Sequence, residues 1–305
     1  MFDIIAGPMG AVLKFIYDHI AFQNYGIAII LFTVGIKSLM LPLTIKQVQS
    51  TSKMGVLQPQ MQEIQKKYKD DKEKQSAELM KLYQENKVSP AGGCLPLLIQ
   101  MPVLFSLYYV ISQPLKYMAG ISAEAIGQLY EMVPQGADKL ANMKDLSIIT
   151  YFSSHTDLLE KVAHLLKPAD LFNMDFLGIN LGAIPAWNPS VYMNPGVGIH
   201  TFLLLLIPVL SALTSYISAK YSMQATPQTS GDQMQSSMQK NMLLMSPVMS
   251  GFISFTVPAG LGLYWIIGNV YQIAQQMFMN RFVIKKPPNS SAANKAVKER
   301  TIEGG

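Results

Sequence analysis

Lys37 is a charged residue inside an apolar stretch of the length that crosses a membrane. Residues 25–45 read YGIAIILFTVGIKSLMLPLTI, and Lys37 is the only charge among them. A lysine at mid-membrane depth costs about 2.5–3.5 kcal/mol on insertion scales. The side chain therefore either snorkels to the cytoplasmic headgroups or lines a wet cavity in which its charge is used.

The depth of Lys37 and the lack of a partner favour the second interpretation. At 1.5 Å per helical residue, Lys37 lies about 18 Å from Tyr25 and about 12 Å from Ile45. The other apolar stretches contain no Asp, Glu or His near that depth. An unpaired cation with polar neighbours predicts a water-filled cavity open to the cytoplasm, which would attract anionic or polar segments.

Amide side chains in other apolar stretches are candidates for the same cavity. Gln100, Asn269 and Gln272 are expensive to bury, and Asn269 and Gln272 lie three residues apart on one helix face. Gln275 and Gln276 follow in the same stretch. Scattered serines and threonines are more typical of hydrogen bonds between membrane helices.

The composition is that of a multi-span membrane protein. The chain has 305 residues, of which 50% are hydrophobic, and a formal net charge of +5. Apolar residues cluster in blocks, and the polar stretches between them hold nearly all the charge. The single cysteine, Cys94, excludes an intrachain disulfide and a cysteine metal cluster. No phosphate-binding loop or catalytic constellation is present, so we expect neither an enzyme nor a cofactor.

Five apolar stretches are predicted to cross the membrane as helices, which makes the fold class an all-α polytopic membrane protein. They cover about 24–46, 94–117, 198–219, 241–257 and 261–279. Residues 1–22 mix apolar side chains with charged ones and suit an amphipathic helix in the membrane interface, with no cleavable signal peptide.

Charge asymmetry predicts the orientation. Residues 46–92 hold nine lysines against six acids, whereas residues 118–197 hold four lysines against eight acids. The 220–240 linker, with Lys220 and Lys240 against Asp232, and the 280–305 tail are also basic. The positive-inside rule therefore places residues 47–92, the 220–239 loop and the tail in the cytoplasm, and the N-terminus and 118–197 outside.

The polar segment 47–92 is predicted to form an antiparallel helical hairpin. One helix face carries residues spaced by 3, 4, 3 and 4 positions, namely Met54, Leu57, Met61, Ile64 and Tyr68. A turn at 69–72 follows, and a second helix of about 73–87 is lined by Leu79, Leu82 and Asn86. The hairpin either captures partners or only links two spans.

Three sequence runs resemble signatures of the YidC-type (YidC/Oxa/Alb) membrane protein insertases. Residues 92–102, GGCLPLLIQMP, resemble the G-C-L-P-x-L-x-Q-x-P signature. The MLPLT run at 40–44, which follows the mid-span cation, and the LYWIIGN run at 263–269 also match. The order of predicted elements matches the family core across about 20–280.

The resemblance implies a five-helix core around a hydrophilic groove, closed outside and open to the cytoplasm and lipid. Lys37 takes the position of a groove arginine, which keeps the charge but loses the planar bidentate fork. Tyr108, Tyr109 and Trp265 match substrate-contacting aromatics, and Ser218 is the nearest match to a polar residue of the third span. The implied groove residues are Lys37, Gln100, Tyr108, Tyr109, Ser218, Trp265, Asn269 and Gln272.

The resemblance also implies a function. Such a protein inserts integral membrane proteins into the bacterial cell membrane and helps them fold, alone or with the Sec translocon. Its partners are nascent membrane proteins, with the Sec translocon, the ribosome, the signal recognition particle machinery and anionic lipids as further candidates. The basic tail fits ribosomal RNA and anionic lipid equally well.

Two other functions are compatible with parts of the sequence. The alternative is a secondary transporter or channel for small anions, but ion-coupled transporters usually carry intramembrane acids and an inverted repeat. Neither feature is found in the sequence. An assembly scaffold that works through the hairpin and tail, with an inert groove, is the third hypothesis.

Overall fold

The structure is a computed structural model that describes residues 3–86, 88, 95–136, 143–193, 198–224 and 233–283. Cys94, residues 225–232 of the predicted 220–239 loop and the tail beyond residue 283 lie outside these ranges, as does the side chain of Met54.

The described chain is mostly helical. Its longer helices are α1 (Asp3–His19), α2 (Tyr25–Leu39), α3 (Leu41–Val56), α4 (Gln58–Lys67), α5 (Lys72–Glu85), α6 (Leu95–Ser112), α8 (Ala123–Met132), α9 (Lys144–Ser154), α12 (Leu206–Gln224), α13 (Gln233–Ile253) and α14 (Ala259–Phe282). Shorter elements are α7 (Pro114–Tyr117), α10 (Ser190–Met193), α11 (Ile199–Leu204), two 3-10 turns at Thr156–Val162 and Pro168–Asp170, and strands β1 (Asp175–Phe176) and β2 (Ile179–Asn180).

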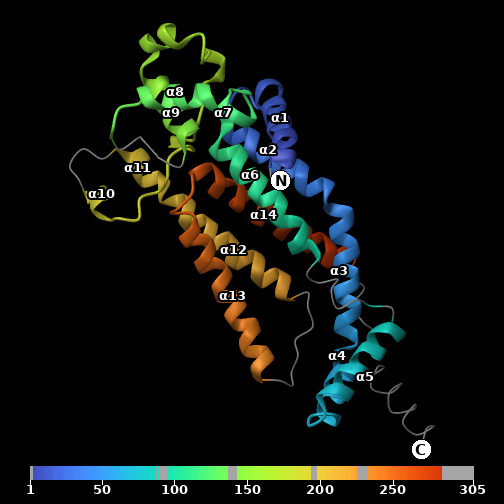
Figure 1. The fold of residues 1–305 in the computed structure, drawn as a ribbon. Coiled ribbons are helices and arrows are strands. Elements are labelled where there is room, and N and C mark those ends of the chain that lie inside the picture. The colour runs from blue at the N-terminus through green and yellow to red at the C-terminus, as the bar shows by residue number, and fades with distance from the viewer. Residues whose placement is uncertain are drawn as a thin grey trace, which may run out of the picture.

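Helices α2, α6, α12, α13 and α14 form a bundle. Helix α14 packs against α12 and α2, and α12 packs against α13, whereas α1 packs on α6 and α2. Helices α8 and α9 lie beyond one end of this bundle, and the α4–α5 pair extends from the other end (Figure 1). The hydroxyl groups of Ser211 and Ser250 lie 2.7 Å apart and join α12 to α13, as expected for serines between membrane helices.

Proline lies at or near a break in three of the stretches that the sequence predicts to cross the membrane. The 24–46 stretch ends as α2 at Leu39 and resumes as α3, bent by 50°. Pro42 lacks an N–H for the carbonyl four residues earlier, and its ring clashes with that carbonyl. The 94–117 stretch breaks at Gln113 before Pro114, and the 198–219 stretch breaks at Leu205 before Pro208. Each of these three predicted crossing stretches therefore consists of two helices in the structure.

The α4–α5 hairpin has the predicted antiparallel arrangement but a different first helix. Pro59 ends the preceding helix at Val56, so the predicted seam is divided between α3 and α4. Hydrogen bonds join the arms: the Tyr83 hydroxyl lies 3.7 Å from the Met61 sulfur, and Gln75 Nε2 donates to the Gln65 carbonyl at 3.0 Å. These contacts define a slender, mostly exposed hairpin.

The two ends of α5 are capped. The Asp71 carboxylate accepts the Lys74 N–H at 3.0 Å, which satisfies one of the free donors of the first turn. Asn86 does not line the hairpin as expected, because it caps the C-terminus with its side-chain amide on the Leu82 carbonyl at 2.8 Å.

Helix length and hydropathy bear on the predicted spans. Among the described residues, the Ile199–Met223 run is long and apolar enough to cross a membrane, and the bent pair α2–α3 passes as a second crossing. The apolar parts of α6 and α13, Gln100–Ser112 and Leu243–Ile253, are shorter. Helix α13 begins at Gln233, inside the predicted 220–239 loop. The five-span topology stays a prediction.

A short β-hairpin departs from the expected all-α fold and closes one end of the bundle. Beyond it, the carbonyls of Leu181 and Ala183 accept the N–H groups of Gly260 and Ala259, both at 2.8 Å. A Cβ on Gly260 would lie 3.2 Å from Ile29 of α2 and 3.3 Å from Ile111 of α6. Buried apolar side chains therefore fill the end of the bundle at which α14 begins.

Asp145 is a buried carboxyl group that joins α9 to α7. Its side chain is 3% exposed, and its Oδ2 accepts the Lys116 N–H at 3.0 Å. Burial raises the pKa of this carboxyl group to about 6, although backbone hydrogen bonds act in the opposite direction. Folding therefore favours the protonated carboxyl group more than the unfolded chain does, and the protonated form predominates below about pH 6.

We expect this carboxyl group to make the α7–α9 contact sensitive to pH. Folding raises the pKa of Asp145. The stabilisation that the protonated Asp145 carboxyl group provides is therefore complete below about pH 4 and is lost as the pH rises through about 6. Amide hydrogen exchange of α9, corrected for its intrinsic pH dependence, should become faster across this interval. Asp145→Asn keeps an acceptor for the Lys116 N–H and should abolish the trend. An unchanged trend in the variant would assign it to another group.

Candidate functional site

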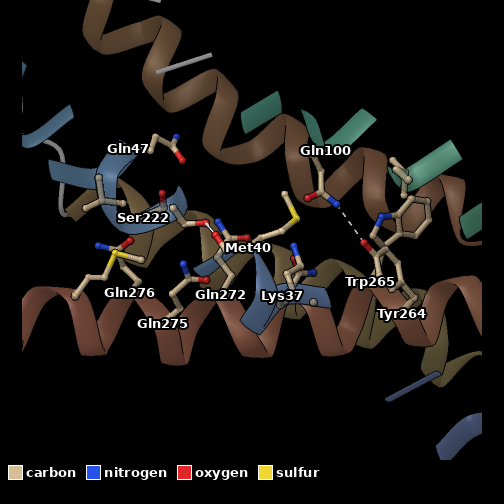
Figure 2. A pocket seen from close by; sticks show the side chains of 16 residues that line it. Lys37, Met40, Gln47, Gln100, Ser222, Tyr264, Trp265, Gln272, Gln275 and Gln276 are labelled. Carbon is tan, nitrogen blue, oxygen red and sulfur yellow. Dashed lines mark hydrogen bonds between the residues drawn. The ribbon is translucent and has the colours of Figure 1, made fainter. Parts of the chain in front are cut away.

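A cavity of about 400 Å³ lies between the bent pair α2–α3 and helices α6, α12 and α14 (Figure 2). Its lining residues are Lys37, Met40, Thr44, Gln47, Val48, Gln100, Leu104, Ser222, Tyr264, Trp265, Gly268, Asn269, Gln272, Gln275, Gln276 and Met279. Lys37 is the one charged member of this set.

Helical periodicity places most of these side chains. Helix α14 presents Trp265, Gly268 and Gln272 at steps of three and four, and the stripe continues to Met279. The α2–α3 pair presents Lys37 and then Thr44 and Gln47 across the bend. The bend at Met40 therefore does not interrupt the row of cavity-lining side chains on α2 and α3.

Lys37 runs along the surface of α14 into the cavity. A Cβ on Gly268 would lie 3.7 Å from Lys37 Cε, so the glycine leaves room for the aliphatic part of the lysine. The Lys37 ammonium group forms no hydrogen bond or ion pair with another residue in the described ranges. A half-buried cation of this kind attracts an anionic or polar ligand.

Two amide side chains, through three hydrogen bonds, hold the walls of the cavity. Asn269 Nδ2 donates to Thr214 and Ser215 of α12, at 3.2 and 2.9 Å, and so joins α14 to α12. Gln100 Nε2 donates to the Tyr264 hydroxyl at 3.1 Å and so joins α6 to α14. These contacts set the spacing of the helices around Lys37.

Five of the eight predicted site residues line the cavity: Lys37, Gln100, Trp265, Asn269 and Gln272. Tyr108 and Tyr109 do not line it; they are half-buried against the apolar core, with ring centres 5.6 Å apart. Ser218 is buried outside the lining, and Ser222, one helical turn further along α12, lines it instead. Whether the lining residues meet a substrate stays a prediction.

Several lining residues were missed in the sequence analysis. They are Met40, Thr44, Gln47, Val48, Leu104, Ser222, Tyr264, Gly268 and Met279. The signal that could have found many of them is helical spacing from Lys37 and from Trp265.

A family model matches most of this chain. The model of a family described as 60Kd inner membrane protein matches residues 15–286. The chain belongs to this family. Membership in the 60Kd inner membrane protein family makes it a mostly helical protein of the bacterial cell membrane.

Several proteins similar to this chain carry the name of a membrane protein insertase. "Membrane protein insertase YidC 2" of Listeria innocua is 31% identical over 301 residues, which cover 97% of this chain and 78% of that protein. "Membrane protein insertase YidC" of Clostridium perfringens is 31% identical, over 90% of this chain and 86% of that protein. The Pelobacter propionicus protein of the same name is 31% identical over 92% of this chain, which spans only 39% of that longer protein.

Proposed function

We propose that this chain is a membrane protein insertase and chaperone that works through the Lys37 cavity. The observation that carries the proposal is the Lys37 ammonium group, unpartnered among the described residues, in a polar cavity between helices of a membrane protein. The names of the relatives agree with this function. We propose no catalytic reaction.

The proposed topology has five spans, with the N-terminus and residues 118–197 outside and the tail in the cytoplasm. It is supported by the excess of lysine in 46–92 and of acids in 118–197. In this orientation the α4–α5 hairpin lies in the cytoplasm and the Leu181–Gly260 contacts lie at the outer end of the bundle. The cavity is then reached from the inside.

The proposed mechanism uses the cavity to shorten the path across the bilayer. The polar flank of a substrate enters the cavity near Lys37, so that only part of the hydrocarbon remains to be crossed. The apolar helix of the substrate then moves past Trp265 and Tyr108 into lipid. Removal of its apolar surface from water drives this step without nucleotide hydrolysis.

The proposed partners are nascent membrane proteins. The Sec translocon, the ribosome and the signal recognition particle machinery would deliver or share substrates, and anionic lipids would meet the basic segments. Lysines of the α4–α5 hairpin, such as Lys66, Lys67 and Lys74, suit contacts with anionic surfaces.

Reconstitution tests the proposed function against the anion-transport alternative. The purified chain is placed in liposomes and given a single-span protein with a short acidic outer tail. We expect a membrane-protected substrate fragment that increases with the amount of chain, while anion flux stays at the level of empty liposomes. Anion flux without a protected fragment would contradict the proposal and support a transporter.

A further inference from the structure

We propose that the glutamines beside Lys37 bind the polar flank of the substrate as an extended chain, through hydrogen bonds to its backbone. This inference rests on the proposed insertase function and deepens it. Lys37 selects for charge, whereas Gln47, Gln272 and Gln275, here called the amide cluster, accept any sequence that is locally extended.

The amide cluster has unused hydrogen-bonding capacity. Gln275 Nε2 is buried and has no hydrogen-bond partner. Gln47 and Gln272 form no side-chain hydrogen bond with another residue of the described ranges. By contrast, the amide nitrogens of Gln100, Asn269 and Gln276 already donate to neighbouring side chains. A buried donor without a partner is destabilising, so a ligand that supplies acceptors is favoured at this place.

The chemistry of the amide cluster matches a peptide backbone. Each glutamine side chain offers two donors and one carbonyl acceptor and carries no charge. A peptide unit in an extended segment exposes one donor and one acceptor that need partners, whereas an α-helix satisfies its own backbone groups. The amide cluster therefore contributes more to the binding of an extended segment than to that of a helix.

The position of the amide cluster also determines which residues an incoming segment meets first. Gln47 and Gln275 lie on one side of Lys37, and Gln100, Tyr264 and Trp265 lie on the other (Figure 2). Gln47 belongs to α3, which leads towards the α4–α5 hairpin (Figure 1). A segment that arrives from the hairpin end therefore meets the amide cluster before it reaches Lys37.

A cysteine scan measures the conformation of the bound flank. Cys94 is replaced by serine, and Thr44→Cys places a thiol in the cavity lining without removing a member of the amide cluster. Stalled substrates carry one cysteine at successive flank positions, and disulfide yield is measured. We expect maxima at every second position, the period of an extended chain. Maxima at every third or fourth position would overturn the inference.

The control for this scan is Leu213→Cys on α12, a half-exposed position outside the cavity lining, which should give low and uniform yields. If the parent chain neither inserts its substrate nor forms any disulfide with it, the proposed function itself fails. A helical period with normal insertion overturns only the extended-chain inference.

Substrates of different charge separate the amide cluster from Lys37. Gln275→Leu and Gln272→Leu should each lower insertion about fivefold, the effect of one lost hydrogen bond, for acidic and neutral flanks alike. Lys37→Gln should lower insertion of the acidic flank only. The matched control Gln128→Leu, on exposed α8, should have no effect. Loss confined to the acidic flank in the glutamine variants, or no loss, would overturn the inference.

Discussion

Lys37→Glu should reduce insertion of a single-span substrate with an acidic outer tail at least about tenfold, which corresponds to about 1.4 kcal/mol. The substitution replaces the only charge of the cavity lining with the opposite one. The tail would then meet repulsion in a partly desolvated site, where charges interact more strongly than in water. The measurement is the yield of membrane-protected substrate in liposomes.

Two further variants and one changed substrate make this result specific. Lys37→Arg keeps the charge and should retain most of the activity, and Lys37→Ala should give an intermediate yield. A substrate whose tail carries lysines in place of acids should be inserted better by Lys37→Glu than by the parent chain. Full insertion of the acidic substrate by Lys37→Glu would refute the attraction mechanism.

Gly10→Ala should destabilise the protein by about 1–3 kcal/mol, the usual cost of overpacking. Gly10 is buried in α1, where a Cβ would collide with the backbone carbonyl oxygen of Tyr117 and lie 2.8 Å from its carbonyl carbon. A backbone neighbour cannot move aside by a change of rotamer, so α1 must shift away from α7. The thermal unfolding midpoint in detergent measures the effect.

Gly7→Ala is the matched control in the same helix. A Cβ on Gly7 meets no atom within 4 Å, and alanine is favoured over glycine inside a helix by up to about 1 kcal/mol. We therefore expect the two substitutions to shift the unfolding midpoint in opposite directions. Equal shifts would show that the close approach of α1 to Tyr117 does not limit stability.

The sequence predicts where the apolar helices lie better than it predicts where they are interrupted. Apolar runs placed α2, α12 and α14 well because side-chain hydropathy dominates in such stretches. The break before Pro59 was predictable in principle, since proline disrupts a helix at a known position. The short β-hairpin at 175–180 was not, because two-residue strands depend on tertiary contacts rather than on a local pattern.

The candidate site was predicted in part for a similar reason. A charge or an amide in an apolar run is visible in one sequence, which is why Lys37, Gln100 and Gln272 were found. The rotation of each helix about its axis depends on packing, and this rotation turned Ser222 rather than Ser218 towards the cavity. Tyr108 and Tyr109 face the core for the same reason.

The apolar packing around Leu181, Ile29 and Ile111 has an electrical consequence for the cell. Under the proposed topology, a wet cavity that reached both faces of the membrane would pass ions and dissipate the potential of about 2.3 kcal/mol per charge per 100 mV. The Leu181 and Ala183 carbonyls fix this outer seal to the first residues of α14. The protein could therefore remain idle between substrates without draining the energy stored across the membrane.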